Sequence, residues 1–425
     1  MAYQEPERQQ FHFSSRKGWL NDPNGLCFHQ GTYHLFYQHN PAAVHWGPMH
    51  WGHATGTDLI HWQEQPIALY PDESGAMFSG CAVVDEQNLT GLGIDPASPP
   101  LLFFYTCAGK PFTQNLAYSL DGGRTVVKYA RNPVVPNLHD SEERDPSVAF
   151  DPASGTWRMA LYLGDERGDF ALLESADLLN WRETALFRIP NGGRECPLFQ
   201  IADETDGKLR WAILEANGNY LVGDIADGRF QAEHAGIFMH RSGLKGGYAG
   251  QTFKNLPDGR RLYIAWQQDY IRGDAFSQSM TLPVELKLVG GELRVHPAVE
   301  TRLLRAGEAQ QFRDASTVNA DGELWELEFE TPLHGVMLNI GGTDLWIDSA
   351  AGVLRCNAGE YPLPHTEKPL RWRAWLDRNT LELFESEGRF WLPLPVQRRP
   401  EPVISVPQGG PLAAVTLRPL QTIWR

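Results

Sequence analysis

The sequence predicts an all-β protein, with a five-bladed β-propeller at residues 1–288 and a C-terminal β-sandwich at residues 289–425. Short runs of aromatic and β-branched residues alternate with turns rich in Gly, Pro, Asp and Asn, whereas helical periodicity is scarce. One strand pattern recurs five times in the N-terminal part, and the pattern changes near Gly290. These observations favour a propeller followed by a second β domain.

The recurring strand is a short apolar run with aromatic residues, and each copy follows another apolar strand and a turn. The copies lie about 50 to 70 residues apart, a spacing typical of propeller blades. A unit of about four strands cannot bury both of its faces alone, so neighbouring units must pack around a common axis. The five copies are Tyr33–Tyr37, Leu102–Tyr105, Trp157–Tyr162, Leu209–Leu214 and Arg261–Trp266.

The second domain is predicted from the turn at Gly290-Gly291 onward. Residues 300–320 are polar and irregular, and alternating strands then return, for example at Leu324–Phe329 and Leu381–Phe384. This pattern indicates a β-sandwich. Because this domain has no cluster of candidate catalytic groups, we expect it to contribute stability. A contact with the substrate is the alternative contribution.

The composition favours a globular protein with a neutral partner. Hydrophobic residues make up 42% and charged residues 21% of the 425 residues, so a large core can be buried. A net charge of −15 argues against nucleic acid or an anionic membrane as the partner. Five cysteines without a CxxC pair indicate no disulfide framework, zinc site or redox motif.

The N-terminus is polar and has no signal-peptide h-region, and no stretch reaches transmembrane length. We therefore expect a cytoplasmic protein, or a secreted one if a signal peptide has been removed.

The stretch WLNDPNG, from Trp19 to Gly25, places the carboxylate of Asp22 between two asparagines. Such a stretch in isolation predicts a turn, because Asx side chains hydrogen-bond their own backbone and glycine permits a sharp reversal. Comparable polar motifs, however, begin every inferred blade. They are Asn21-Asp22-Pro23, Phe78-Ser79-Gly80-Cys81, Arg144-Asp145-Pro146, Arg194-Glu195-Cys196-Pro197 and Tyr248-Ala249-Gly250-Gln251.

The first strand of each propeller blade lines the central channel, so these motifs are expected to meet at one mouth of it. Asp22, Asp145 and Glu195 would then share a pocket with Arg144, with hydroxyl and amide groups, and with tryptophans. Glycoside hydrolysis requires one ionised carboxylate that attacks the anomeric carbon and one protonated carboxyl that protonates the leaving oxygen. Crowding of like charges raises the pKa of at least one carboxyl group, which separates these two roles.

The motifs closely resemble the β-fructofuranosidases of glycoside hydrolase family 32, which include invertases, levanases and exo-inulinases. The resemblance spans both domains in the same order. The segments that carry it are WLNDPNG, Tyr33–Pro41, Trp46-Gly47, Trp51–Ala54, Phe78–Gly80, Arg144–Pro146, Glu195-Cys196, Ser279–Leu286 and Leu376–Phe384.

The resemblance implies that Asp22 is the nucleophile, Glu195 the general acid/base, and Asp145 the residue that binds fructosyl hydroxyls in the transition state. The mechanism would be retaining, through a covalent fructosyl-enzyme, with the Asp22 and Glu195 carboxyl groups about 5–5.5 Å apart. It implies a small carbohydrate as the partner, no cofactor and no metal. The residues that it implies for the fructosyl pocket are Asn21, Gln38, Trp46, Phe78, Ser79, Arg144 and Trp266.

Two departures from the family pattern concern specificity. Leu198 directly follows the Glu-Cys-Pro motif, where the family often has an acidic residue. Ala265-Trp266-Gln267 stands where Gly-Trp-Met is frequent. Neither change replaces a proposed catalytic group, so we expect any effect on the leaving-group side of the pocket.

Two motifs could indicate a different chemistry. His45, His50 and His53 crowd one segment and could bind a metal, although structural hydrogen bonding is the favoured interpretation because no other ligands lie at suitable spacing. Cys196 could be a nucleophile, but no base signature surrounds it, so packing beside Glu195 is favoured.

Two further residues have a purely structural alternative. Trp51 fits blade packing and the pocket equally well. Arg144 could pair with Glu142 or Glu143 on the surface, but its place at a blade opening favours the pocket.

The favoured function is exo-acting hydrolysis of terminal β-D-fructofuranosyl residues from fructans, fructooligosaccharides or sucrose. The segment Asp72–Gly80 is more similar to levanases and exo-inulinases than to sucrose-6-phosphate hydrolases, which usually have a longer insertion there. An invertase or a fructosyltransferase would use the same catalytic residues and stays an alternative. A non-catalytic fructan-binding propeller is disfavoured because all three carboxylates are present. The sequence does not predict the linkage preference or the oligomeric state.

Overall fold

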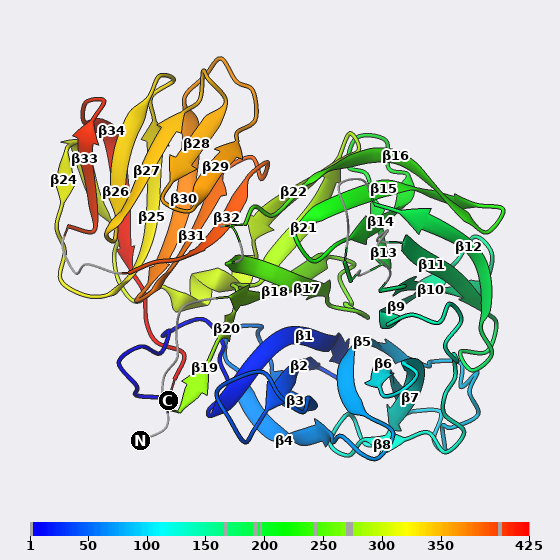
Figure 1. The fold of residues 1–425 in the computed structure, drawn as a ribbon. Helices are drawn as coiled ribbons and strands as arrows, with labels where there is room; N and C mark the ends of the chain where they lie inside the picture. Colours follow the sequence, from blue (N-terminus) through cyan, green and yellow to red (C-terminus); the bar gives the residue numbers. More distant parts are fainter. Residues whose placement is uncertain are drawn as a thin grey trace.

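The computed structural model describes residues 3–164, 169–189, 194–195, 198–241, 243, 245–268, 275–397 and 402–424. Its N-terminal strands form five sheets around a central axis, and its C-terminal strands form a pair of sheets at one side (Figure 1). This confirms the all-β class, with a five-bladed propeller followed by a β-sandwich.

Each blade is a sheet whose first strand contacts the first strand of at least one neighbouring blade, which places these strands around the axis. Blade one contains β1 (Gly18–His29), β2 (Thr32–Asn40), β3 (His50–Gly56) and β4 (Gln63–Leu69). Blade two contains β5 (Ala76–Val84), β6 (Leu101–Ala108), β7 (Thr113–Ser119) and β8 (Val127–Lys128). Blade three contains β9 (Arg144–Asp151), β10 (Thr156–Tyr162), β11 (Asp169–Ser175) and β12 (Arg182–Arg188).

Blade four contains β13 (Leu198–Ala202), β14 (Leu209–Leu214), β15 (Asn219–Ala226) and β16 (Arg229–Ile237). Blade five contains β17 (Gly246–Thr252), β18 (Arg261–Gln268), β20 (Ser279–Met280), β21 (Val284–Val289) and β22 (Glu292–Pro297). The short strand β19 (Phe276–Ser277) pairs in parallel with β1, so it joins the last blade to the first. The five recurring runs predicted from the sequence lie in β2, β6, β10, β14 and β18, the second strand of every blade.

The innermost strands carry β-bulges at corresponding places. In β1, β5, β9 and β17, two residues lie opposite one residue of the second strand. A bulge interrupts the ladder and redirects the side chains next to it. The bulged pairs are Asn21-Asp22, Phe78-Ser79, Asp145-Pro146 and Ala249-Gly250.

The turn that WLNDPNG predicts in isolation does not form, because this stretch lies inside β1 and continues through it. A second bulge between Asn24 and Cys27 includes Gly25, whose φ is +53°. A Cβ at Gly25 would lie 3.0 Å from the Phe36 ring and 3.1 Å from the Trp51 ring. The glycine thus serves a bulge and the close packing of two aromatic rings of blade one, not a chain reversal.

The propeller core lies between the blades, as expected for units that cannot bury their own faces. Buried clusters combine residues of blades one and two, two and three, three and four, four and five, and five and one. For example, Phe36 and Trp51 of blade one pack against Phe103 of blade two.

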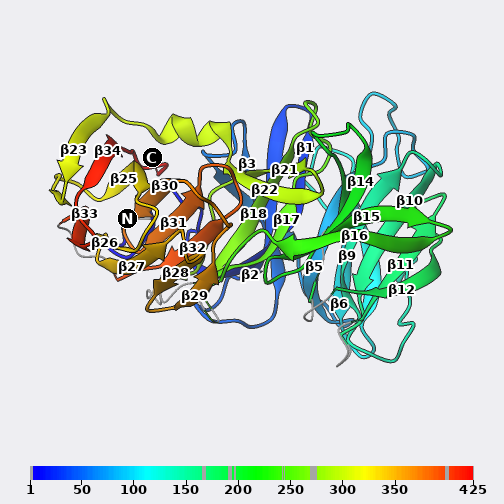
Figure 2. The same ribbon diagram turned by 90° about the horizontal axis from the view of Figure 1, so that it is seen from above.

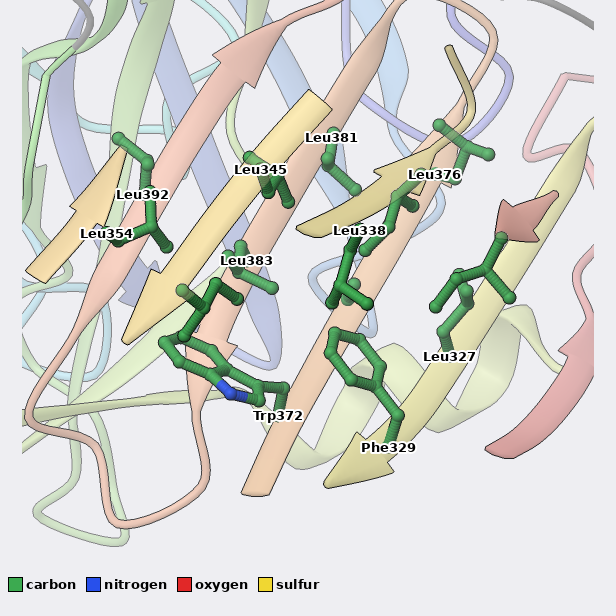
Figure 3. Packing of buried hydrophobic residues seen from close by; sticks show 14 of the residues in the cluster. Leu327, Phe329, Leu338, Leu345, Leu354, Trp372, Leu376, Leu381, Leu383 and Leu392 are labelled. Atoms are coloured by element: carbon green, nitrogen blue, oxygen red, sulfur yellow. The ribbon is translucent and has the colours of Figure 1, made fainter. Parts of the chain in front are cut away.

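The C-terminal domain consists of two six-stranded sheets that pack face to face, as Figure 2 shows from above. One sheet contains β23 (Gln310–Ala315), β34 (Leu412–Pro419), β25 (Leu324–Thr331), β30 (Leu370–Asp377), β31 (Thr380–Glu385) and β32 (Trp391–Pro395). The other contains β24 (Thr317–Val318), β33 (Ile404–Gln408), β26 (Val336–Ile340), β27 (Thr343–Asp348), β28 (Val353–Cys356) and β29 (Gly359–Pro362). Leu327, Phe329 and Trp372 of the first sheet meet Leu338 and Leu345 of the second in a buried core (Figure 3).

The boundary expected at residue 288 falls inside β21. All six residues of β22 pair with β21 in the sheet of blade five, so the propeller continues to Pro297. The 3₁₀ helix η1 (Val299–Leu304) follows before the sandwich begins at β23. The Gly290-Gly291 turn that suggested a new domain is a hairpin within the last blade.

Candidate active site

The first strands of the blades bring the predicted catalytic residues into one pocket, which we call the carboxylate pocket. Asp22 comes from β1, Asp145 from β9, and Glu195 from the segment just before β13. Its lining residues are Asp22, Ser79, Asp145, Glu195, Ala216, Ala249, Gly250 and Gln251. The convergence predicted from the five blade openings is therefore observed, since every blade contributes to the lining.

Asp22 is held by hydrogen bonds on both carboxylate oxygens. Asn21 Nδ2 donates to Oδ1 at 3.1 Å, and Ser79 Oγ donates to Oδ2 at 2.8 Å. Asn21 is itself oriented by Trp19, whose Nε1 donates to Asn21 Oδ1 at 2.7 Å. Donors on an ionised carboxylate stabilise its charged form and fix its direction. Asp22 is thus positioned as an anion.

Asp145 has a φ of +63°, which a non-glycine residue adopts only where its surroundings hold it. Its backbone N–H donates to Thr106 Oγ1 at 2.9 Å, and the Thr106 hydroxyl donates to Gln114 Oε1 at 2.7 Å. Gln114 Nε2 then donates to the Glu143 carbonyl at 3.0 Å. This buried chain of bonds fastens the bulge of blade three to β6 and β7 of blade two.

Glu195 also has a positive φ, +52°. The segment that carries it is fastened by backbone bonds across two blades: Ala216 N donates to the Arg194 carbonyl at 2.8 Å, and Ala249 N donates to the Ala216 carbonyl at 3.0 Å. Glu195 Oε2 is buried, and no described residue hydrogen-bonds to it. The carboxyl group therefore keeps one oxygen available for a substrate.

Arg144 belongs to the pocket. Its Nε lies 3.5 Å from Asp145 Oδ2 and 3.6 Å from Glu195 Oε1, whereas the closest approach to the Glu142 carboxylate is 4.0 Å. The guanidinium also lies over the Tyr162 ring, 4.7 Å from its centroid. Arg144 is thus the cation between two carboxylates of the pocket, and its contact with the exposed Glu142 carboxylate is longer.

The electrostatics of the pocket favour protonation of at least one carboxyl group. Burial and the charge of Asp22 raise the pKa of Glu195 to about 7, against the opposing effects of Arg144 and of a hydrogen bond from Tyr248. Burial raises the pKa of Asp22 as well, while the bonds from Asn21 and Ser79 oppose the rise. Burial and the charge of Glu195 raise the pKa of Asp145 well above its usual value. Three carboxyl groups this close cannot all ionise easily.

Asp145 and Glu195 both hold protons readily, but their surroundings differ. No described side chain donates a normal hydrogen bond to the Asp145 carboxyl group; its nearest donor is Arg144. Hydroxyl groups of a bound sugar would supply such donors and lower the pKa of Asp145. Glu195 would then be the carboxyl group that keeps the proton.

Two groups of aromatic side chains include the aromatic residues predicted for the sugar pocket. In the first, Trp46 is 56% exposed, and its ring lies 6.1 Å from that of Phe78, which in turn lies 5.7 Å from Phe112. In the second, the Trp266 ring lies 5.9 Å from Trp19 and 6.0 Å from Tyr248. An exposed aromatic face such as that of Trp46 suits the apolar face of a sugar ring.

Gln38, predicted for the fructosyl pocket, and Trp51, for which pocket and packing were both open, are not among the lining residues. Gln38 is 2% exposed, and its Nε2 donates to the Met77 carbonyl at 2.9 Å, so it ties β2 to β5. Trp51 is 0% exposed, and its Nε1 donates to the Phe78 carbonyl at 2.9 Å. The packing alternative for Trp51 is therefore the observed one.

The three histidines make separate contacts. His53 Nε2 lies 3.1 Å from His34 Nδ1 inside blade one, whereas His45 and His50 approach the carbonyls of Trp46 and Pro48. Over the described ranges, no group of three or more His, Cys, Asp or Glu residues could hold a metal ion. Cys196 lies outside the described residues. Within them, no helix is long and apolar enough to span a membrane.

The sequence analysis missed the residues that support the pocket from neighbouring blades. Gln251 lies at a predicted blade opening but was given no role; its Nε2 donates to the Gly80 carbonyl at 3.1 Å. Thr106 is a polar residue at the end of an otherwise apolar strand, a signal that could have been used. Ala216 carries no such signal, because its contribution is a backbone contact.

Comparison with known proteins identifies related sequences. A family model described as the glycosyl hydrolases family 32 N-terminal domain matches residues 12–297. A levanase of Bacillus subtilis (strain 168) is 29% identical over 487 residues, with 99% of this chain and 72% of the levanase covered. An extracellular exo-inulinase of Aspergillus niger is 38% identical over 319 residues, with 64% of this chain and 59% of that protein covered.

Solved structures match along the whole chain. The crystal structure of an exo-inulinase from Aspergillus awamori superimposes with a TM-score of 0.86 at 24% identity and covers 100% of both chains, which shows the shared fold. A β-fructofuranosidase of Bombyx mori, solved in complex with sucrose, matches with a TM-score of 0.79 at 25% identity over 98% of this chain and 95% of that chain.

Proposed function

Because this chain belongs to glycosyl hydrolase family 32 and is a glycoside hydrolase of the β-fructofuranosidase type, we propose that it is a retaining exo-β-fructosidase. Its substrates would be the terminal β-D-fructofuranosyl residues of fructans, fructooligosaccharides or sucrose. The observation that carries the proposal is the pocket itself, where three carboxyl groups from three blades meet and one has a pKa of about 7.

In the first step, Asp22 attacks C2 of the terminal fructosyl unit, and the bond between C2 and the leaving oxygen breaks. Glu195 gives its proton to that oxygen, so the leaving group departs as an alcohol and a covalent fructosyl-enzyme forms. In the second step, Glu195 takes a proton from water, which attacks C2 and releases fructose and the Asp22 carboxylate. Both steps pass through positive charge at C2, which the Asp22 carboxylate stabilises as it attacks in the first step and as it leaves in the second.

The supporting residues fit these roles. Asn21 and Ser79 hold Asp22 as an anion, and Arg144 limits the mutual repulsion of Asp145 and Glu195. Asp145 would accept hydrogen bonds from fructosyl hydroxyls, which supply the donors that its carboxyl group lacks. We expect the carboxyl groups of Asp22 and Glu195 to lie about 5–5.5 Å apart, the separation of retaining enzymes.

Similarity to a levanase over 99% of the chain, and to exo-inulinases in sequence and fold, supports fructans as the substrate class. A neutral polymer also suits a chain with a net charge of −15. Sucrose stays in the proposal because a related β-fructofuranosidase is known in complex with it.

The test is fructose release from sucrose, from inulin-type and levan-type oligosaccharides, and from both polymers. An Asp22→Asn protein, which keeps the size and fold but lacks the nucleophile, should lose at least about a thousandfold in kcat. Asp95→Asn, a change at an exposed aspartate remote from the pocket, is the matched control and should keep wild-type turnover.

Each pattern of products has a distinct meaning. Free fructose and chains shortened one unit at a time support exo-hydrolysis and rank the linkages. New, longer oligosaccharides would identify a fructosyltransferase instead. Sugar binding without turnover in the wild-type protein would contradict the proposal and indicate a binding propeller, and near wild-type activity of Asp22→Asn would contradict the assigned nucleophile.

A further inference from the structure

A second cavity lies at the opposite end of the propeller channel. The carboxylate pocket is formed near the starts of the inner strands, whereas this cavity is lined by the ends of β5, β9 and β17 and by the middle of β13. Its volume is about 560 Å³. We call it the lower cavity.

Two cations of the lower cavity lack a carboxylate partner. Lys254 Nζ donates to the Leu198 carbonyl at 2.6 Å, and Arg261 donates to the carbonyls of Gln200, Gly259 and Arg260. Among the described residues, no carboxylate lies within ion-pair distance of either side chain. Burial, together with the charge of Arg261, lowers the pKa of Lys254 to about 8. Both side chains are partly buried, and carbonyl oxygens rather than a carboxylate accept their hydrogen bonds.

Two neutral donors of the same lining also lack partners. Thr252 Oγ1 and Trp157 Nε1 are buried, and neither has a hydrogen-bond partner within the described ranges. Thr252 is only 2% exposed. Buried hydroxyl and indole groups normally find a partner, so two unsatisfied donors in the wall of a cavity point to an acceptor that the described residues do not supply.

The carboxylates of the lining do not neutralise these donors. Both oxygens of Asp85 already accept hydrogen bonds, from Leu89 N at 2.8 Å and from Thr90 N and Oγ1 at 3.0 and 2.7 Å. Glu86 is exposed.

The third cation of the lining, Arg260, is already paired with Asp258 and Glu300. Apart from the exposed Glu86, the unpaired charges of the lining are therefore those of Lys254 and Arg261.

We propose that the lower cavity binds a phosphate group, either as free phosphate or as part of a phosphorylated sugar. A tetrahedral oxyanion accepts several hydrogen bonds and brings the negative charge that Lys254 and Arg261 lack. The carboxylate pocket would repel the same ion, so the two ends of the channel select ligands of opposite character. The cavity volume exceeds that of a phosphate ion, which leaves room for an attached sugar.

The test measures binding to the full-length protein in a phosphate-free buffer, by calorimetry and by the shift in melting temperature. The probes are inorganic phosphate, glucose 6-phosphate and glucose; glucose 6-phosphate is chosen because it carries no fructosyl unit for the carboxylate pocket. We expect phosphate and glucose 6-phosphate to bind and raise the melting temperature, and glucose to have no effect.

Amino-acid substitutions in the lining test whether phosphate binds in the lower cavity. Lys254→Met keeps the side-chain length and removes the charge, and should weaken phosphate binding at least tenfold. Thr252→Val is close in shape and serves as a second variant, with an expected several-fold loss, should Lys254→Met fail to fold. Lys208→Met, a surface change outside the lining, is the control and should bind as the wild type does.

Tighter binding of glucose 6-phosphate than of phosphate would identify a phosphorylated sugar as the ligand, and equal affinity would identify free phosphate. Absence of binding would overturn the proposal, as would binding that Lys254→Met and Thr252→Val leave unchanged. Equal binding of glucose and glucose 6-phosphate would overturn it as well, because the cavity would then be a neutral sugar site.

Discussion

At the scale of single residues, the roles of the three carboxyl groups follow from their different neighbours. Asp22 accepts two side-chain hydrogen bonds, whereas Glu195 has a buried oxygen that no described residue bonds. Hydrogen bonds to the charged form favour ionisation, and burial without them favours the neutral acid. Similar groups in one pocket can therefore serve as nucleophile and acid at the same pH.

This difference predicts the pH dependence. The general acid must be protonated, so kcat/KM should fall as the pH rises through the pKa of Glu195, about 7. The Tyr248 hydroxyl stabilises ionised Glu195, so Tyr248→Phe should raise this pKa further and move the alkaline limb to higher pH. The measurement is kcat/KM for fructose release, taken at intervals of about half a pH unit between about pH 4 and 9. An alkaline limb that moves to lower pH would contradict the role of Tyr248; Tyr118→Phe is the control.

At the scale of elements, the bulges of the inner strands determine where catalytic groups point. A regular strand alternates its side chains between faces, whereas a bulge adds a residue and turns the neighbouring side chain. Two of the bulged residues suit the local geometry. Pro146 has no N–H to leave unpaired. At Gly250, a Cβ would lie 2.2 Å from the Tyr263 ring. Catalytic placement thus depends on a backbone irregularity repeated around the ring.

The bulge of blade three offers a test that is independent of the catalytic groups. Thr106→Val removes the hydroxyl that accepts from Asp145 N and donates to Gln114, without changing the size of the side chain much. Small displacements of a positioned group are costly, so kcat should fall about 10- to 100-fold while KM changes less. The measurement is steady-state kinetics with circular dichroism to check the fold. Thr184→Val, on the outer strand β12, is the control, and equal activity of both variants would contradict the positioning role.

At the scale of the whole molecule, the N-terminal segment fastens the sandwich to the propeller. His12 lies fully buried between two carboxylates of the sandwich, with Nδ1 2.8 Å from Asp377 Oδ2 and Nε2 2.9 Å from Glu382 Oε1. Glu382 also accepts from Leu282 N of blade five at 2.7 Å and from Trp391 Nε1 at 2.9 Å. Both domains therefore share one buried polar network.

This network predicts how stability depends on pH. Burial opposes the charged imidazolium, but the hydrogen bonds and charges of Asp377 and Glu382 outweigh it and raise the pKa of His12 to about 9. A raised folded pKa stabilises the fold fully below the unfolded pKa of 6.5, and this stabilisation is lost as the pH rises through about 9.

His12→Gln should remove this dependence and lower the free energy of unfolding by about 3–5 kcal/mol, because two buried carboxylates lose their cation. The measurement is thermal unfolding of both proteins between about pH 6 and 10, the window in which His12 titrates. His334→Gln, at an exposed histidine of the sandwich, should leave the curve unchanged. Parallel pH curves for wild type and His12→Gln would contradict the charged state of His12.

The sequence by itself determined the fold class, the recurrence of five blades, and the motifs that carry Asp22, Arg144, Asp145 and Glu195. These features are local: strand propensity, turn residues and short motifs leave a signal within a few consecutive positions. Because equivalent strands of a propeller must meet at its axis, repetition alone was enough to predict that the motifs converge.

Only the tertiary structure decided the features that depend on which strands become neighbours. The stretch around Asp22 follows turn rules in isolation, but pairing with β2 holds it in a bulged strand. The support of Asp145 by Thr106 joins two blades, and the pairing of β22 with β21 sets the end of the propeller. The unpaired cations of the lower cavity lie in separate segments whose proximity no local pattern reveals. Long-range pairing overrides local preference because burial and a complete hydrogen-bond ladder stabilise a segment more than its own turn propensity does.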